Sequence, residues 1–498
     1  MKKILILLTL SLMLISCQKF LDIIPQDKAY KEDLLQNRSG FEMALSGAYT
    51  DLNARPLYGK ELKFGFMETL VGSYSLMGNS HPYYRSYNHH YTYPEFLQYS
   101  NAIWGGLYGI INQANNILED VDNIIDDPYY KIVKGEALGI RAMCHFQLLK
   151  IFGPVIKQEG LNAIAIPYRD AVVFTATKFS TAGEVIAKLN KDLDEARKLM
   201  EDDPIRKSSR TADLNQTRHA NYNSLLDRRG NRMNYFAIVG FQSLLAQWEG
   251  NLQKAAEYAE ELIQEFDEHK VITLAQENDI NNESTRRLPR ENIFALINQD
   301  LRLSALTVFP EPSGNTIIAT RHLVPNYRWL GDNLYISGLH GSNQDGRFIL
   351  NHWFSVLSGG AYLVNKYDFR STANFYSPDL DAALFEVKVI SLHNIYMVAA
   401  EYYAVTDKEK AISYLNKVRN ARGIRNNIVY TSNMSDVLIQ NTVFAEVRKE
   451  AFGEGYLFTE YKRLFKEIDR PIPVKESLNL FKLPYPVHEL TNNPQENL

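Results

Sequence analysis

The chain has 498 residues and a formal net charge of −4, with 54 Lys and Arg against 58 Asp and Glu. This balance argues against nucleic acid as the partner, because no basic stripe matches a phosphate backbone. The length allows a large core and two to four domains, and two cysteines are too few for a disulfide framework. The unusual feature is 30 tyrosines and 24 phenylalanines against 4 tryptophans.

The N-terminus has the pattern of a bacterial lipoprotein signal. Two lysines precede a short apolar run, which ends in the lipobox-like Leu14-Ile15-Ser16-Cys17. The run is too short to stay as a membrane span. We therefore expect a signal peptide at residues 1–16, acylation of Cys17 with chains such as palmitate, and a tether at 17–38 that docks on the body. The alternative is an ordinary secretory leader followed by a chance cysteine.

Residues 39–270 have mostly helical periodicity. The first helix is expected from Ser39 to Asn53, and another apolar stripe starts at Ser100. Asp127 and Pro128 have the residue types of a helix cap and first turn, and Gly153-Pro154 would end that helix. Thr181 and Glu184 form a capping box before the next one. Buried Cys144 is expected to be an inert thiol on a helical stripe.

The stretch from Asn234 to Phe266 predicts two packed helices. The first is apolar almost all round, which is typical of an enclosed helix. The second has one apolar stripe, and Gly250 and Asn251 between the two supply a helix stop and a cap. Such a hairpin cannot bury its faces alone, so it indicates one unit of a tetratricopeptide-like array.

Residues 74–99 interrupt the helical pattern with seven tyrosines and three histidines. We predict a long aromatic loop. Loops of this length are usually functional or disordered, and disordered segments are poor in aromatic residues. The polar stretch from Glu201 to Arg232 is instead expected to be a solvated surface loop.

The second half of the chain divides into two further parts. Residues 271–385 lose helical regularity and predict an irregular, loop-rich subdomain. Residues 386–498 contain a second helical unit, with a capping box expected at Thr406 to Glu409, a final helix over 442–464 and a proline-rich tail. The predicted fold class is mostly α, a tetratricopeptide-like helical-repeat scaffold with an irregular, loop-rich ligand-binding subdomain.

Six short motifs, in order behind the lipobox, resemble the SusD/RagB family of surface lipoproteins. They are Cys17 with Phe20-Leu21-Asp22, Trp104-x-x-Leu107-Tyr108, Gly135-Glu136-Ala137 through Phe152-Gly153-Pro154, Asn416-x-Val418-Arg419-x-x-Arg422-Gly423, Glu446-x-Arg448-x-Glu450 with Glu454-Gly455, and Pro484-Tyr485-Pro486. The resemblance implies a cell-surface protein of the outer membrane that captures nutrient and passes it to a SusC-like TonB-dependent transporter. Ligand identity cannot be carried over, because the aromatic loops share no motif with the family.

The residues themselves favour a binding protein over an enzyme. The chain lacks a His-Glu-x-x-His, Gly-x-Ser-x-Gly or phosphate-loop motif, and we expect no catalytic residue, cofactor or metal site. Adjacent His89 and His90 would point to opposite sides of an extended segment. Tyrosine and tryptophan faces can instead stack on sugar rings or peptide side chains at low entropic cost.

The predicted ligand-binding residues fall in two clusters, the early loop and the late subdomain: Tyr83, Tyr84, Tyr87, His89, His90 and Tyr91, and Trp329, His340 and Trp353. Each of them could equally pack the loops against the scaffold. The expected ligand is an oligosaccharide, with a peptide as the alternative. A different class, a repeat scaffold that binds only proteins, predicts no small ligand at all.

Overall fold

The structure is a computed structural model that describes residues 34–75, 77–207, 223–310, 320–357, 360–368 and 382–494. The signal peptide, Cys17 and most of the predicted tether lie outside the described residues.

The amino-terminal part is helical, as predicted. Its longer helices are α3 (Arg38–Leu52), α6 (Pro94–Asp120), α7 (Tyr130–Phe152) and α9 (Ala182–Leu199). Thr181 and Glu184 form the expected capping box, with the Glu184 amide donating to Thr181 Oγ1 over 3.2 Å. The α7 helix starts later than predicted because Asp127 caps a preceding turn, in which its Oδ1 accepts from the Tyr129 amide.

The predicted hairpin is confirmed as α11 (Tyr235–Glu249) and α12 (Leu252–His269). Gly250 has a φ of +94°, the left-handed conformation that stops a helix, and the Asn251 side chain accepts from the Lys254 amide. The apolar stripe of α12 is buried from Ala255 to Phe266.

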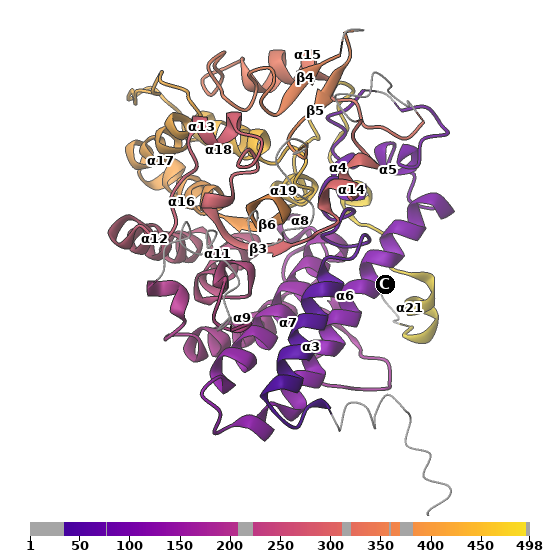
Figure 1. Ribbon diagram of the computed structural model, residues 1–498. Helices are drawn as coiled ribbons and strands as arrows, with labels where there is room; N and C mark the ends of the chain where they lie inside the picture. Colours follow the sequence, from indigo (N-terminus) through magenta and orange to yellow (C-terminus); the bar gives the residue numbers. More distant parts are fainter. Residues whose placement is uncertain are drawn as a thin grey trace, which may run out of the picture.

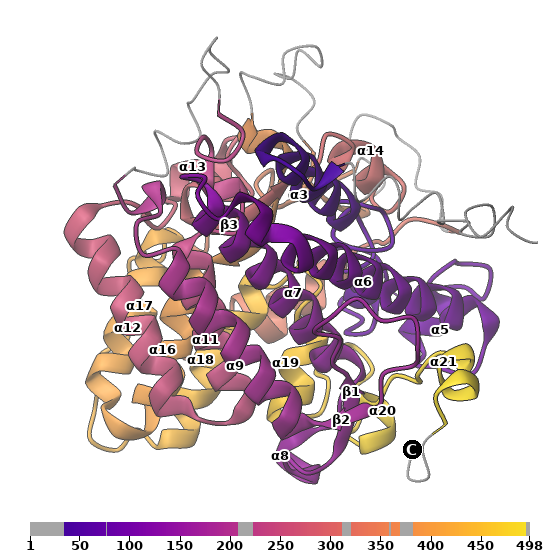
Figure 2. The same ribbon diagram turned by 90° about the horizontal axis from the view of Figure 1, so that it is seen from below.

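A second helical unit follows near the end of the chain, formed by α16 (Leu392–Thr406) and α17 (Lys408–Ala421). Consecutive helices pack in the order α6, α7, α9, α11, α12, α16 and α17, and Figure 2 shows the last four of them side by side. This is the stacking of a helical-repeat protein, so the predicted fold class is confirmed.

Two details of the carboxyl-terminal part were predicted wrongly. Asp407, and not Thr406, caps α17, because its side chain accepts from the Lys410 amide at 3.1 Å. The single helix expected over 442–464 is two helices, α18 (Asp436–Glu450) and α19 (Leu457–Leu464). Gly453 and Gly455 between them both have a φ of +74°, a conformation that a continuous helix cannot contain.

The stretch over 271–385 is irregular, as expected, but it also contributes a buried strand. Strand β3 (Asn292–Ile297) pairs antiparallel with β6 (Glu386–Ser391), which leads directly into α16. Nearly every residue of both strands is buried. The pair therefore fastens the irregular region to the second repeat unit.

The remaining elements are short. They are α4 (Phe66–Thr69), α5 (Tyr84–Tyr87), α8 (Ile156–Glu159), α13 (Glu277–Asn281), α14 (Leu301–Leu306), α15 (Tyr327–Leu330), α20 (Leu478–Phe481), α21 (Val487–Asn492), the strand pairs β1 (Ile164–Pro167) with β2 (Phe179–Thr181) and β4 (Phe354–Val356) with β5 (Tyr362–Val364), the 3-10 turns Val121–Ile124, Pro204–Lys207, Arg229–Asn231, Pro289–Glu291 and Ala382–Phe385, and a π turn at Gly331–Tyr335.

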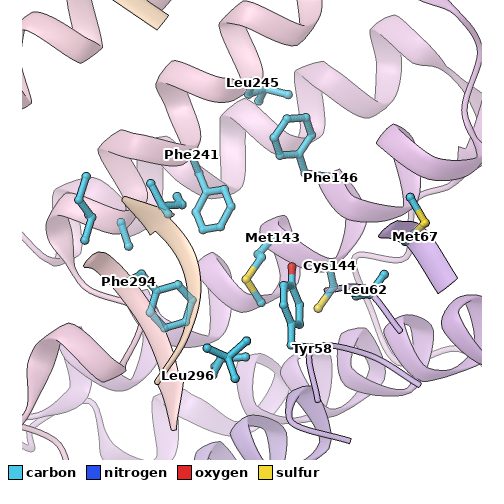
Figure 3. Close-up of a cluster of buried hydrophobic side chains, with 14 of the residues drawn as sticks. Tyr58, Leu62, Met67, Met143, Cys144, Phe146, Phe241, Leu245, Phe294 and Leu296 are labelled. Atoms are coloured by element: carbon cyan, nitrogen blue, oxygen red, sulfur yellow. The ribbon is translucent and has the colours of Figure 1, made fainter. Parts of the chain in front are cut away.

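The core lies where α7, α11 and β3 meet. Figure 3 shows Phe241 of α11 between Phe146 and Met143 of α7 on one side and Phe294 of β3 on the other. Cys144 is in the same core, and its complete burial raises the pKa of the thiol well above its usual value. The thiol is therefore held in its neutral form, as a packing residue.

The stretch expected to be a solvated loop, Glu201 to Arg232, contains a buried ion cluster where it is described. The Arg229 guanidinium donates to Asp203 Oδ2 over 2.7 Å and also to Glu136, and both carboxylates are fully buried. This prediction was wrong for the described residues. The charged groups neutralise one another inside the protein, and a charge count along the sequence cannot detect that.

Candidate functional site

The predicted aromatic loop over 74–99 is more ordered than its sequence suggested. Residues 84–87 form α5, and α6 begins at Pro94, six residues before the expected start at Ser100. Proline is favoured at the first helical position because it has no amide hydrogen to leave unpaired. The remaining connection between the two helices is a short, compact turn.

Two of the predicted ligand-binding tyrosines point into the core. Tyr83 and Tyr87 are one helical turn apart and each has only 2% of its surface exposed. The Tyr83 hydroxyl donates to Glu61 Oε2 over 2.9 Å, and burial together with that carboxylate raises the pKa of Tyr83 well above its usual value. The Arg470 guanidinium covers the Tyr87 ring at 4.5 Å. Neither ring offers a free face to a ligand.

His89 and Tyr91 are half-buried and make anchoring contacts. His89 has a φ of +56°, and its Nε2 donates to the Leu70 carbonyl at 2.8 Å. Burial lowers the pKa of His89 to about 4, so the ring is neutral at pH 7. The Tyr91 hydroxyl donates to the Leu480 carbonyl at 2.5 Å. These contacts fix the turn between α5 and α6.

The outer side of the same turn carries a group that we call the α5 surface, formed by Tyr84, Arg85, His90 and Tyr93. The Arg85 guanidinium lies 3.9 Å from the centre of the Tyr93 ring and 5.3 Å from that of Tyr84. His90 packs edge-on against Tyr84 and lies 5.5 Å from Tyr93. Tyr93 is 43% exposed and the other three are half-buried.

Arg85 is the chemically distinctive member of the α5 surface. Within the described residues it has no ion pair with a carboxylate, and its side-chain hydrogen bond is a long one, 3.5 Å from Nη1 to His90 Nδ1. Two tyrosine rings therefore hold a guanidinium whose donors stay available. The sequence analysis missed Arg85 and Tyr93, although Pro94 as a first helical residue could have marked Tyr93 as an exposed cap position.

The predicted residues of the late subdomain, Trp329, His340 and Trp353, also differ in burial. Trp353 is fully buried, its Nε1 donates to the Arg286 carbonyl at 2.8 Å, and Lys366 Nζ lies 4.0 Å from its ring. His340 is half-buried, and its carbonyl accepts from Arg419 and Lys449. Trp329, also half-buried, lies on the short helix α15. Of these three predicted residues, Trp329 is the one that combines a large ring with a position at the surface.

Beside Trp329, the structure places a column of stacked rings. Tyr327 lies between Phe348 and Tyr362, with ring centres 4.1 and 4.0 Å away and planes within 11° of parallel. Tyr335 extends the column beyond Phe348 at 4.7 Å. Burial and the neighbouring Tyr362 raise the pKa of Tyr327 to about 12. Tyr362, half-buried at one end of the column, is a flat platform of the kind that stacks on ligands.

The two predicted clusters belong to segments that pair in space. Tyr74 forms an antiparallel bridge with Pro325, the Ser75 amide donates to the Val324 carbonyl at 2.8 Å, and the Asn326 amide donates back to Ser73. Asn326 also caps α15. In Figure 1, α5, α15, β4 and β5 accordingly lie in the upper part of the molecule, opposite the lower ends of α3 and α9.

A buried ion network links the irregular region, which carries α15, β4 and β5, to α18. Glu450 of α18 lies within 3.4 Å of nitrogen atoms of Arg347, Lys388 and Arg422. Arg347 comes from the irregular region and Lys388 from β6. The motif Glu446-x-Arg448-x-Glu450 therefore contributes to the scaffold that positions the aromatic segments.

Comparisons with known proteins agree with this architecture. Residues 19–226 match a protein family described as "Starch-binding associating with outer membrane". Among solved structures, a SusD-like carbohydrate binding protein from Bacteroides vulgatus has a TM-score of 0.66 and 17% identity, covering 91% of this chain and 96% of that one. A SusD superfamily protein from Bacteroides thetaiotaomicron has a TM-score of 0.66 and 18% identity, covering 91% and 97%.

A sugar binding protein from Bacteroides vulgatus, described as putative, has a TM-score of 0.61 and 19% identity, covering 92% and 96%. At these identities the likeness shows the shared fold. A comparison with curated proteins gives no significant match.

The fold defines a class, mostly helical proteins built on tetratricopeptide-like repeats. Residues 19–226 match the SusD-like family, and most of the chain shares its fold with solved structures of SusD superfamily proteins. The family is described as starch-binding and associated with the outer membrane. In the part of the chain that the structure describes, no helix is both long and apolar enough to span a bilayer.

Proposed function

We propose that this protein is a non-catalytic, lipid-anchored cell-surface protein that binds an oligosaccharide and delivers it to a SusC-like TonB-dependent transporter of the outer membrane. The observation that carries the proposal is the α5 surface, where Arg85 is held between Tyr84 and Tyr93 without a carboxylate partner among the described residues. The family description and the similar sugar-binding structures support the same ligand class.

The chemistry of the α5 surface suits a sugar. A pyranose has apolar C–H faces, which stack on tyrosine rings, and a rim of hydroxyl groups, which accept hydrogen bonds from a guanidinium. Trp329 and Tyr362 supply further flat surfaces at the paired segment. Tyr83, Tyr87 and Trp353 support these residues from the core and are not part of the proposed contact surface.

The test is calorimetric titration of polysaccharides of several classes, and of mixed peptides, into the protein. We expect saturable binding of one glycan class, weakened at least about tenfold when Arg85 and Tyr93 are both changed to Ala, since stacking and a charged hydrogen bond each contribute about 1–3 kcal/mol. The matched control is Tyr130→Ala with Lys134→Ala, a half-buried pair in which a cation likewise lies 5.5 Å from the centre of a tyrosine ring.

The possible outcomes separate the alternatives. Glycan binding that survives the Arg85 and Tyr93 substitutions would overturn the α5 site. A binding signal with peptides and none with glycans would favour peptide uptake. The absence of a signal with either ligand class would favour a scaffold that binds only proteins. For the anchor, Cys17→Ala should release the protein from membranes in a high-salt wash, and retention of this variant would contradict the lipid attachment.

A further inference from the structure

A cavity lies between the turn that joins α11 to α12 and the helices α18 and α19, and none of its lining residues belongs to the α5 surface. It has a volume of about 580 Å³ and is bordered by α8, the turn between α11 and α12, α18 and the end of α19. Pockets for small molecules typically have volumes of roughly 300–1,000 Å³. This cleft is therefore large enough for a small organic ligand.

One wall of the cleft is apolar. Val437, Phe444 and Val447 of α18 line it, opposite Leu252 at the start of α12. Val437 has 63% of its surface exposed, although it lies in a regular helix beside this cavity. An apolar group placed against this wall would remove that side chain from water, which is favourable.

The lining of the cleft also includes two lysines, Lys157 and Lys466, that are not held by a carboxylate within the described residues. Lys157 Nζ donates to the Leu464 carbonyl at 3.0 Å, and Lys466 Nζ donates to Asn441 Oδ1 at 2.9 Å. Burial lowers the pKa of Lys466, and the nearby cations Lys157 and Arg448 lower it further, against a smaller opposing effect of Glu401.

The other charged residues of the cleft do not neutralise these two lysines. Lys462 Nζ donates to two backbone carbonyls, and Arg463 holds Glu401 through two hydrogen bonds of 2.8 and 2.9 Å. Glu249, at the end of α11, is the other carboxylate in the lining. Lys462 is fully buried, with a pKa that burial lowers to about 7, and Arg463 is paired with Glu460 as well as Glu401. Lys157 and Lys466 therefore supply the available positive charge of the cleft.

The charged groups of the cleft adjoin its apolar wall. Asn441, which accepts from Lys466, lies on α18 together with Phe444, and Lys466 Nζ lies 5.7 Å from the centre of the Phe444 ring. The cleft therefore places ammonium groups directly beside an apolar surface.

We propose that this cleft binds a small organic carboxylate with an apolar body, its carboxylate between Lys157 and Lys466 and its body against Val437 and Phe444. The site is independent of the proposed glycan surface. An uncharged sugar would leave the two ammonium groups without a counter-charge, whereas a carboxylate would provide one with charge-assisted hydrogen bonds.

The probe is 3-phenylpropionate, with 3-phenylpropionamide as its uncharged counterpart. Binding to the full-length lipoprotein in lipid nanodiscs is measured by saturation-transfer NMR, with empty nanodiscs as the blank. We expect saturable binding of the acid, and at least tenfold weaker binding of the amide. No saturable binding of the acid, or equal affinity for acid and amide, would overturn the proposal.

Variants locate the site. Lys157→Met with Lys466→Met should weaken binding of the acid at least tenfold, whereas Lys191→Met on the exposed face of α9 should not change it. Lys466→Arg keeps the charge and should keep the affinity within about threefold, which distinguishes loss of charge from loss of fold. Unchanged affinity in the double Met variant, or equal loss in the Arg and Met variants, would contradict the assigned role.

Discussion

Neutralising Glu450 is expected to destabilise the whole carboxyl-terminal half. Its carboxylate is 1% exposed and accepts from Arg422 at 3.2 Å, Arg347 at 3.1 Å and Lys388 at 3.4 Å. Burial alone would raise the pKa of Glu450, but these cations hold it well below its usual value. A glutamine at this position keeps the shape of the side chain and leaves three buried cations with one anionic acceptor fewer.

The expected loss follows from the geometry. Removing one partner of a buried ion pair typically costs about 3–5 kcal/mol, because the remaining charge is left in a low dielectric. Arg422 retains Glu291 at 2.8 Å and Arg347 retains Asp345 at 2.7 Å, so those two guanidinium groups stay partly compensated. We therefore expect Glu450→Gln to cost about 3 kcal/mol, near the lower end of that range.

The assay is urea unfolding followed by circular dichroism, with Glu476→Gln as the exposed control that should change stability by less than about 0.5 kcal/mol. Amide hydrogen exchange should also accelerate in β3 and β6, which the network joins to α18. A loss below about 1 kcal/mol, with unchanged exchange in the two strands, would refute the view that this network fastens the irregular region to the repeats.

Two further predictions concern a buried acid and a turn. Burial raises the pKa of Glu68 to about 7 despite amide donors from Gly453 and Gly455, so its contribution to stability is lost as pH rises from about 4.5 to 7. Glu68→Gln should remove roughly 3 kcal/mol of pH-dependent stability, measured by urea unfolding between pH 4.5 and pH 8, and an unchanged pH dependence would contradict the assignment. Gly250→Ala should cost about 1 kcal/mol of stability through its φ of +94° alone, since no atom lies within 4 Å of the added Cβ. Gly109→Ala, within α6, is the control and should be neutral or stabilising. Equal shifts of the melting temperature in the two variants would refute this reasoning.

The repeat scaffold could be predicted from the sequence because its signals are local. The stripe of α12, Gly250 as a stop and Thr181 as a cap act within one or two helical turns, and each was correctly assigned. The errors arose where two local signals compete. Thr406 and Asp407 are both good caps, and the backbone at Asp407 decides between them.

The strands and the buried charges depend on partners far away in the chain. Strand β3 pairs with residues about 94 positions later, and Arg229 meets Glu136 across 93 positions. Sequence periodicity carries no information about contacts between residues so far apart in the chain. The charged stretch from Glu201 to Arg232 was therefore predicted to be solvated, although its described part contains buried charges. The motif around Glu450 was recognised only through the family resemblance.

The sequence also could not predict which aromatic residues lie in the core and which lie at the surface. Helix α5 has four residues, too few for a periodic signal, yet it decides that Tyr83 faces Glu61 while Tyr84 faces Arg85. The sequence analysis therefore could not separate the buried rings from those at the surface, and the ligand-binding role of this region stays a prediction.

The arginines of the scaffold differ from Arg85 of the candidate site in the groups that hold them. Arg229, Arg347 and Arg422 are buried, and each is held by two or more carboxylates, because an uncompensated guanidinium in the interior would be very costly. Arg85 is half-buried and is held by tyrosine rings instead. Rings fix its position without neutralising its charge or occupying its donors. In the scaffold, guanidinium donors are taken up by carboxylates in these three arginines and by the carbonyls of His340 and Asn426 at Arg419. Recognition needs a positioned group with donors left over, and the α5 surface meets that condition.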